Sequence, residues 1–425
     1  MSGVRVLIVG ASVAGPSAAY WFAKAGANVT VIERFPQLRT NGQNVDIRTI
    51  GVTAMRRMAG MEAAVRSKLV PMEGISFVRS SGQPYGTITP TGDPDQQSLI
   101  SEFEIYRGDL ARILYDMTKD HKNVRYVFGE QVTAMQQREK DGPVMVEFAN
   151  GHVTSEFDLV VAADGATSRT RALALDCDVR DHMHPINAWA AWFTVAPGLL
   201  DGIPVAQAYS AVGGRFIAVA PDPKGGNRIT VMGVYPRSSP ALIEPFRKAA
   251  ADGEQATKLF IADQFRSAGW HTDAIVAAML DPSSSEFYAT EMVQLKPPAF
   301  YKGRVALVGD AGYASGPTGL GTSLAIAGAY ILAGEIARHP GDLQQGLKAY
   351  NERMRPIVDK MCKLPPLIPG VLAPYTTGGL WLRNTVFTVL CWTKMVEFGQ
   401  RHLAGAFASN EGDAQLPEYD FGKGE

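Results

Sequence analysis

The first 35 residues of this 425-residue chain hold the pattern that most restricts its fold. An apolar run over 4–9 ends in Gly10, small residues continue to Gly15, and apolar residues then recur at helical spacing. A second run, rich in β-branched residues, covers 29–32 and ends at Glu33. Strand, glycine turn, helix and strand in this order predict a βαβ unit, whose two strands lie parallel in one sheet. The expected fold class is therefore α/β.

The turn between the first strand and the helix has the character of a dinucleotide phosphate site. Glycine permits its tight backbone, and the helix that follows offers unpaired N–H groups and the positive end of its dipole. The residues expected to approach the phosphate are Gly10, Ser12, Ala14 and Gly15. Ser12 stands where the GxGxxG pattern has its middle glycine, so a strand–helix turn without a ligand is the alternative interpretation.

Glu33 supports the dinucleotide interpretation by its position. It follows Gly15 by 18 residues and ends the second strand. A carboxylate about 20 residues beyond the glycines can accept hydrogen bonds from both ribose hydroxyls of an ADP group. The alternative is an ordinary solvated charge at the end of a strand.

Composition narrows the classes of function. The chain is 46% hydrophobic and 20% charged, and its formal net charge of -1 gives it no general attraction for nucleic acid. Three scattered cysteines and seven scattered histidines form neither a disulfide framework nor a metal-site pattern, so we expect no metal and a cytoplasmic location. The apolar run at 386–392 is far shorter than the ~20 residues that cross a bilayer, which predicts a buried helix, with contact to a membrane surface as the less favoured alternative. We expect a monomer or a homodimer.

Later segments predict that the sheet is assembled from distant parts of the chain. Buried strands are expected at 158–163 and 304–308, and a helix of small residues at 321–338. Between them, short aromatic or alternating runs are separated by Pro- and Gly-rich turns, which indicates a mainly β insertion. The expected division is a Rossmann-like dinucleotide-binding domain over 1–180 and 301–345, a mainly β substrate-binding domain over 181–300, and a C-terminal helical region with a polar, fraying tail over 346–425.

Three signatures in this order resemble those of the single-component FAD-dependent aromatic hydroxylases. This is the para-hydroxybenzoate hydroxylase type, which includes tetracycline-inactivating monooxygenases. The signatures are the N-terminal turn with Glu33, the segment DLVVAADGATSR at 158–169, and Gly309-Asp310-Ala311-Gly312 followed by Pro317, Gly319 and Gly321. Together they span residues 4 to about 338. The chain departs from the family at Gly312-Tyr313, where the family often has GDAAH, so no relative's substrate can be assigned.

The resemblance implies a non-covalently bound FAD and a role for each motif. Asp310 would accept hydrogen bonds from the ribityl chain, although a strand-end carboxylate can also cap a helix. The segment 319–321 would bring a helix N-terminus to the flavin edge, where its dipole stabilises the negative charge of reduced flavin. Asp164 and Gly165 would serve both FAD and the nicotinamide cofactor. Arg169 and Arg171 are candidates for the latter, or ordinary surface arginines.

Two further arginines match positions that reach the cofactor in the family. Arg107 begins a predicted helix, and Arg48 lies in a segment that normally covers the flavin; surface solvation is the alternative for both. The full set expected at the cofactor is Gly10, Ser12, Ala14, Gly15, Glu33, Arg34, Arg48, Arg107, Asp164, Gly165, Gly309, Asp310, Pro317, Gly319, Leu320 and Gly321.

The substrate is expected between the β domain and the flavin. The candidate pocket residues are Trp192, Tyr209, Phe216, Met232 and Tyr313, and an ordinary sheet core would use the same residue types. The sequence shows no catalytic triad, so no catalytic side chain is expected and the flavin carries the chemistry.

The function implied is an NAD(P)H- and O2-dependent FAD monooxygenase. It would insert one oxygen atom into a hydrophobic, aromatic or polycyclic small molecule through a C4a-hydroperoxyflavin, by hydroxylation in preference to epoxidation or Baeyer–Villiger insertion. NADPH or NADH would bind transiently, because 180–300 contains no second glycine-turn unit. An FAD-dependent oxidase, dehydrogenase or halogenase is the alternative, although 189–192 lacks the WxWxIP signature of halogenases. A flavin-binding interaction protein without turnover is the alternative from another class.

Overall fold

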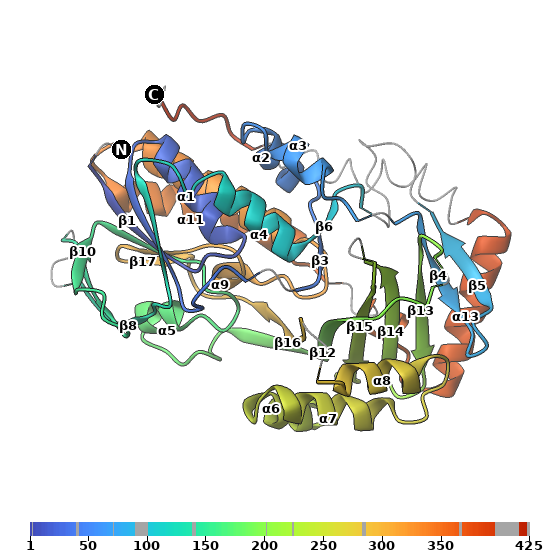
Figure 1. The fold of residues 1–425 in the computed structure, drawn as a ribbon. Coiled ribbons are helices and arrows are strands. Elements are labelled where there is room, and N and C mark those ends of the chain that lie inside the picture. Colours follow the sequence, from blue (N-terminus) through green and yellow to red (C-terminus); the bar gives the residue numbers. More distant parts are fainter. Residues whose placement is uncertain are drawn as a thin grey trace.

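The computed structural model describes the chain except residues 2, 40–41, 71, 90–100, 138–141, 201, 223–224, 283–285, 365–367, 396–415 and 423–425. Within the described residues, two large sheets lie side by side (Figure 1). The first has six strands, all parallel except β17. Their order is β17 (Tyr301–Lys302), β18 (Val305–Leu307), β11 (Leu159–Ala162), β1 (Arg5–Val9), β2 (Asn28–Glu33) and β7 (Val124–Phe128). The predicted α/β class and the βαβ unit are confirmed.

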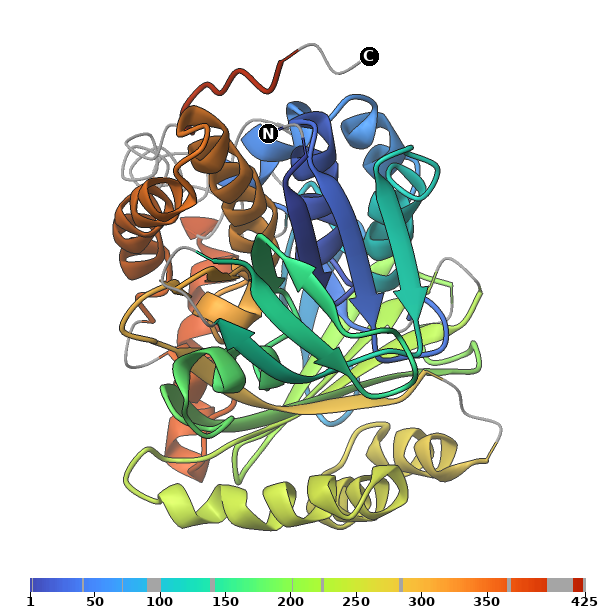
Figure 2. The same cartoon turned by 90° about the vertical axis from the view of Figure 1, so that its left-hand side faces the viewer.

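Both faces of this sheet are covered, which explains why its central strands are apolar throughout. Val6 and Ile8 face a core formed with helices α1 (Ala14–Lys24) and α10 (Gly321–Arg338). Their neighbours Leu7 and Val9 point the other way, because side chains alternate along a strand. That second face is covered by a small sheet in front of the parallel strands (Figure 2). It consists of β8 (Val132–Gln137), β9 (Val144–Phe148) and β10 (Ser155–Phe157).

The second large sheet has seven strands and is mostly antiparallel. Its order is β16 (Tyr288–Leu295), β12 (Met183–Val195), β15 (Asn227–Val234), β14 (Arg215–Pro221), β13 (Val205–Ala211), β4 (Gly74–Val78) and β5 (Pro84–Ile88). The expected division placed 74–88 with the first domain. Hydrogen bonding instead places β4 beside β13, in parallel, and β5 at the edge of the second sheet.

Three helices cover one face of the seven-stranded sheet: α6 (Glu244–Ala251), α7 (Glu254–Phe265) and α8 (Thr272–Leu280) (Figure 1). Trp189 on β12 is buried on this face, stacked on Phe246 with ring centroids 5.2 Å apart. The opposite face carries Ala188, Ala190 and Trp192. Because the first large sheet lies on that side, this second face is the one available to a ligand held between the sheets.

The C-terminal region corrects two expectations. Helix α13 (Thr377–Trp392) contains the apolar run expected to be buried, yet none of its residues is buried, and Trp392 is 84% exposed. The helix packs along the edge strand β5 and leaves its outer face open. The tail expected to fray is packed over Leu416–Phe421: Phe421 stacks on Trp21 at 4.9 Å, and Tyr419 donates to Glu335 Oε1 at 2.7 Å.

The remaining elements connect these layers. They are β3 (Asn44–Asp46), α2 (Ile50–Arg56), α3 (Met61–Arg66), β6 (Glu104–Tyr106), α4 (Arg107–Asp116), α5 (Arg169–Leu175), η1 (Pro240–Ile243), α9 (Asp310–Tyr313), α11 (Leu343–Met361) and α12 (Ile368–Leu372). Among the described helices, none is both long enough and apolar enough to cross a membrane.

Candidate active site

A cavity of about 580 Å³ lies where the carboxyl ends of the parallel strands face the seven-stranded sheet. Ligands of open α/β sheets bind at this edge, where strand ends and helix N-termini meet. Of the residues expected at the cofactor, the cavity is lined by Gly10, Ser12, Ala14, Glu33, Arg34, Arg107, Asp164, Gly165, Asp310, Pro317, Gly319 and Gly321. Segments more than 300 residues apart in the chain are therefore brought to one place.

The glycines of the N-terminal turn are required by the protein itself. Gly10 has φ +109°, and a Cβ there would lie 2.5 Å from the Ala163 carbonyl oxygen. A Cβ at Gly15 would lie 1.8 Å from the Gly10 carbonyl oxygen. Gly15 stands outside the cavity lining, so it allows helix α1 to pack closely on the turn rather than touching a ligand. No side chain caps the N-terminus of α1, whose first N–H groups face the cavity through Ala14.

Glu33 is held at the wall of the cavity by two backbone groups. Its Oε2 accepts a hydrogen bond from the N–H of Ala11 at 2.9 Å, and its Oε1 accepts one from Phe35 at 3.1 Å. Each carboxylate oxygen has a second lone pair, so the geometry leaves acceptor capacity for two hydroxyl donors. Arg34 also lines the cavity, with its guanidinium carbon 4.9 Å from the centroid of the Phe35 ring.

Arg107 connects the turn to the other end of the cavity. It is the first residue of α4, and its Nη2 donates to Ser12 Oγ at 2.8 Å, so the serine in place of a glycine has a definite partner. Asp310 opens to the cavity but is enclosed by protein on its other sides. Desolvation there raises the pKa of its carboxyl, and the positive charge of Arg107 lowers it.

Asp164 forms the start of α5 as well as part of the cavity. Its carboxylate accepts hydrogen bonds from the hydroxyls of Ser168 and Thr170 and from the Thr170 N–H. Burial raises the pKa of the carboxyl, and these donors lower it. Ser168 also accepts from the Arg171 N–H at 2.8 Å. The side chain of Ser168 therefore caps helix α5.

Arg171 is not a surface arginine, nor is it available to a nicotinamide cofactor. It is fully buried and donates to three carbonyl oxygens, those of Ala166 at 2.9 Å, Ala311 at 3.2 Å and Val179 at 2.7 Å. It thus ties the loop before α5 to helix α9. Arg169 is exposed and lines the cavity, so it stays a candidate for the reductant.

Arg48, Gly309 and Leu320 also stand outside the lining. Arg48 points to Asp46, whose Oδ2 lies 3.1 Å from Nε and 3.0 Å from Nη2, and it is Asp46 that faces the cavity. Gly309 has φ +64°, and a Cβ there would lie 2.9 Å from that of Ala14, so its role is close packing of β18 on α1. Leu320 precedes the first turn of α10 as its N-cap residue.

The lining also contains polar and aromatic side chains that were not expected at the site from the sequence, among them Arg39, Asp46, Glu104 and Tyr288. Arg39 lies between two rings, with its guanidinium carbon 4.8 Å from the centroid of Phe35 and 5.5 Å from that of Tyr288. Burial, and then the nearby Arg107, lower the pKa of Arg39. No sequence signal joins residues 39 and 288, because the contact exists only once the two sheets meet.

Glu104 on β6 is a third carboxyl of the site whose pKa is raised. Burial, followed by the like charge of Asp46, raises its pKa to about 7. A hydrogen bond from Asn44 Nδ2 to its Oε1 at 2.9 Å opposes the shift. Burial also raises the pKa of Asp46, which Arg48 counteracts. The cavity wall therefore holds a carboxyl that changes charge near neutral pH.

Of the expected substrate residues, only Trp192 lines this cavity, where its ring stacks on Tyr288 with centroids 5.8 Å apart. Tyr209 lines a different, smaller cavity, and Phe216 and Met232 belong to the core of the sheet. Tyr313 was expected at the pocket rim and is 1% exposed. It packs on Phe300 at 5.2 Å and its hydroxyl accepts from Tyr350 at 3.2 Å, because it points between α10 and α11 rather than toward the cavity.

Comparison with known proteins agrees with this geometry. The family described as FAD binding domain matches residues 3–364 of the chain. The chain belongs to this FAD-binding family. Monooxygenase CTB7 of Cercospora beticola is 32% identical over 99% of both chains, and the FAD-dependent monooxygenase asL4 of Sarocladium schorii is 34% identical over 99% of both. The crystal structure of tetracycline destructase Tet(51) superposes with a TM-score of 0.75 at 27% identity, covering 98% of this chain and 99% of that one.

As a member of this FAD-binding family, the chain is an FAD-dependent monooxygenase whose cofactor is FAD. The cavity fits that cofactor. Its volume lies within the range of small-molecule sites, and glycines keep it open where the chain approaches a ligand. A Cβ at Gly321 would lie 3.5 Å from Asp310 Oδ1 and one at Gly319 3.5 Å from Asp46 Oδ2, both inside the space. Among the described residues, no group of three or more His, Cys, Asp or Glu side chains is placed to hold a metal.

Proposed function

We propose that the protein uses NADPH or NADH and O2 to insert one oxygen atom into a hydrophobic, aromatic or polycyclic small molecule. Hydroxylation is favoured, and epoxidation or Baeyer–Villiger insertion would use the same scaffold. The observation that supports this most is that one cavity joins two kinds of wall. Dinucleotide-type strand ends form one side, and the stacked rings of Trp192 and Tyr288 form the other.

The strand ends would hold FAD along the parallel sheet. The turn from Gly10 to Ala14, with the N-terminus of α1, suits the pyrophosphate, and the carboxylate of Glu33 suits the ribose hydroxyls. Asp310 suits the ribityl hydroxyls, and Arg107 would supply positive charge beside it. When bound and reduced by NADPH or NADH, FAD would supply the electrons that activate dioxygen, of which one oxygen atom enters the substrate and the other leaves as water.

The second sheet would position the substrate and exclude water from it. Trp192 and Tyr288 present a flat stacked pair, and Thr290, Met292 and Val293 continue the wall along β16. Aromatic faces bind planar ligands by offset stacking, and a largely apolar wall keeps water away from the reacting atoms. The likeness to a protein named for tetracycline supports a polycyclic substrate class. The relatives from Cercospora beticola and Sarocladium schorii are both named monooxygenases, and we propose a role in secondary metabolism for this chain.

The reductant would bind at the open side of the cavity. Arg169 is exposed there, next to the turn at Asp164 and Gly165, and can meet a phosphate of NADPH or NADH. A donor at the surface reaches a flavin only in an outward position. We therefore propose that substrate binding favours that position and so gates reduction of the flavin.

The test measures oxygen uptake and NAD(P)H oxidation by the FAD-loaded protein, with and without planar aromatic compounds. We expect little oxidation without substrate and at least tenfold faster oxidation, with product formed, in the presence of one. Arg169→Ala should raise the KM for the nicotinamide cofactor while FAD content stays unchanged. Fast oxidation that releases one H2O2 per NAD(P)H and no oxygenated product from any compound would favour an oxidase. Absence of any turnover would favour a flavin-binding interaction protein.

A further inference from the structure

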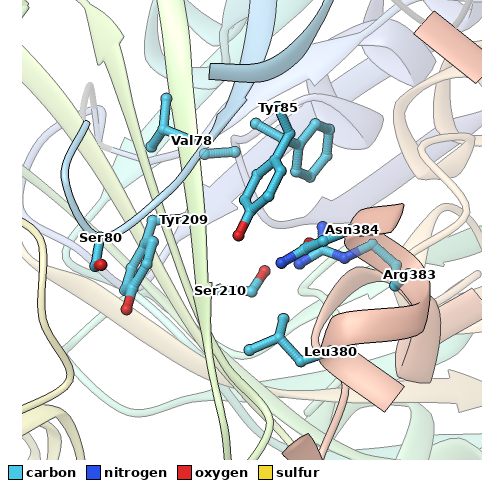
Figure 3. Close-up of a pocket in the computed structure, with 10 residues that line it drawn as sticks. Val78, Ser80, Tyr85, Tyr209, Ser210, Leu380, Arg383 and Asn384 are labelled. Atoms are coloured by element: carbon cyan, nitrogen blue, oxygen red, sulfur yellow. The ribbon is translucent and has the colours of Figure 1, made fainter. Parts of the chain in front are cut away.

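A second cavity, of about 190 Å³, lies at the opposite edge of the seven-stranded sheet from the flavin cavity. The flavin cavity contacts β12 and β16, whereas the second cavity is enclosed by β4, β5, β13 and helix α13 (Figure 3). The two share no lining residue. Occupation of the second cavity would therefore be a separate event from binding in front of the flavin.

The wall contributed by α13 carries an arginine that has no acidic partner among the described residues. Arg383 is partly buried against the sheet, with its guanidinium carbon 5.3 Å from the centroid of the Phe77 ring. Its Nε is buried without a hydrogen-bond partner, and no acidic side chain among the described residues pairs with the guanidinium. Burial lowers its pKa from the ordinary value of 12.5, but an arginine stays charged at neutral pH. A half-buried cation without an anion is costly unless a ligand completes it.

Other polar groups converge on the same space. Figure 3 shows the hydroxyl of Tyr85 and the nitrogen atoms of Arg383 and Asn384 directed toward the centre of the cavity, beside the hydroxyl of Ser210. Ser210 Oγ donates to the Leu372 carbonyl at 3.1 Å, which leaves its lone pairs free to accept. Tyr85 and Asn384 can both donate. The guanidinium of Arg383, the hydroxyl of Tyr85 and the amide of Asn384 can thus donate to one ligand, an arrangement suited to an anion.

The remaining wall is partly apolar, with Ser80 and Tyr209 as further polar lining residues, and the cavity is built into the fold. Phe77, Val78 and Leu380 line it beside the polar groups. Helix α13 can approach β5 this closely because residue 86 is glycine: a Cβ there would lie 2.5 Å from the sulfur of Cys391. Thr376 caps the helix by accepting from the Gly379 N–H at 3.1 Å. The position of Arg383 is therefore fixed by the packing of the helix and does not depend on a ligand.

We propose that this cavity is a binding site for a small organic carboxylate. The carboxylate pairs with the guanidinium of Arg383, with Tyr85 and Asn384 as further donors, and the apolar body of the ligand lies against Phe77 and Leu380. The volume restricts the ligand to about the size of a single ring with a short acidic side chain. The site is independent of the flavin, so its occupation does not require turnover.

The test uses phenylacetate as the probe and its neutral amide, phenylacetamide, as the charge control. Isothermal titration calorimetry of the FAD-loaded protein should give one site for phenylacetate, at least tenfold tighter than for the amide. Arg383→Met keeps the length of the side chain and should lose at least tenfold in affinity. Arg266→Gln removes an arginine paired with Asp263 on the protein surface and should bind as the parent does.

A second variant keeps the proposal testable if Arg383→Met folds poorly. Asn384→Ala changes a partly exposed helix residue and should weaken phenylacetate binding three- to tenfold without altering FAD content. The flavin absorbance spectrum, recorded during each titration, should remain unchanged because the ligand binds away from the flavin cavity. Absence of phenylacetate binding by the parent, or equal affinity in Arg383→Met or Asn384→Ala, would overturn the proposal, as would a flavin spectral change that accounts for the calorimetric signal.

Discussion

The two large sheets form opposite walls of the flavin cavity in different ways. The parallel sheet presents strand ends, where backbone N–H groups and a few carboxylates meet at one edge. The seven-stranded sheet presents one of its faces, where large side chains form the wall. A wall made of strand ends is encoded in short contiguous motifs. A wall made of a sheet face depends on which side each residue points to, and that is decided by packing far away in the sequence.

Two tryptophans on β12 test this difference most strongly. Trp189 lies in the core, stacked on Phe246 and donating from Nε1 to Tyr235 at 3.1 Å, whereas Trp192 faces the cavity. We expect Trp189→Ala to lower the free energy of unfolding by about 3–5 kcal/mol. Trp192→Ala should cost far less stability and instead raise the KM for substrate. Thermal unfolding and steady-state kinetics of both variants provide the measurement, and a reversed pattern would show that the two faces have been assigned the wrong way round.

Two glycines near the parallel sheet differ in a similar way: we expect one to be needed for folding and the other for FAD binding. Gly10→Val places a side chain against Ala163 at a backbone with positive φ, so we expect a loss of about 3 kcal/mol or more in stability even without FAD. At Gly321 the backbone φ is ordinary and an added Cβ makes only van der Waals contacts, 3.5 Å from Asp310 Oδ1, so Gly321→Ala should affect FAD retention and leave folding of the apoprotein unchanged. Equal unfolding temperatures of the Gly10→Val and parent apoproteins would contradict this account.

The variant Asp310→Ala tests how much one strand-end carboxylate contributes to FAD binding. Asp310→Ala would leave ribityl hydroxyls unpaired and should weaken FAD binding by about 1–3 kcal/mol, or roughly five- to 150-fold. Asp263→Ala, at an exposed site on α7, is the matched control and should leave FAD affinity unchanged. Fluorescence titration of the apoproteins with FAD gives both values. Unchanged affinity in Asp310→Ala would remove Asp310 from the cofactor site.

For Glu104, at the border between the two walls, we expect a smaller effect, on the pH dependence of stability. Its pKa is raised by burial, and then by Asp46, from 4.5 to about 7, so the folded protein favours the neutral acid. This contribution to stability is complete below pH 4.5 and is lost as the pH rises through 7. Glu104→Gln should therefore gain about 1–2 kcal/mol relative to the parent at pH 8 and little at pH 5. Parallel unfolding-temperature curves of the two proteins between pH 5 and 8 would contradict the shifted pKa.

The wall formed by strand ends could be predicted from the sequence better than the positions that depend on packing between distant segments. The turn at Gly10, the carboxylate of Glu33 and the strand end at Asp310 were predicted because each belongs to a local pattern whose geometry is fixed by its own backbone. The role of Arg171 was not predicted, since nothing in its sequence context distinguishes a surface arginine from a buried one that donates to three carbonyl oxygens. Tyr313 points away from the cavity because α10 and α11 pack there, which the strand-end motif before it does not specify.

Contacts between distant segments set the limit of prediction elsewhere. Arg39 and Tyr288 meet only when the two sheets are assembled, and β4 and β5 join a sheet whose other strands begin about 100 residues later. The apolar helix α13 was expected to be buried, but an edge strand offers it a single packing partner and leaves its outer face exposed. In each case the types of residue could be interpreted from the sequence, but the segment that they pack against could not be predicted.

The central claim is that both walls serve one oxygen-insertion reaction, and isotope labelling tests it most directly. The FAD-loaded protein is incubated with NADPH or NADH, a compound that stimulates oxygen uptake, and dioxygen labelled with oxygen-18, and the product is analysed by mass spectrometry. The account predicts one labelled oxygen atom per product molecule, and none when the label is supplied only as water. A product without label from dioxygen, or an oxidised product formed with stoichiometric H2O2, would contradict it.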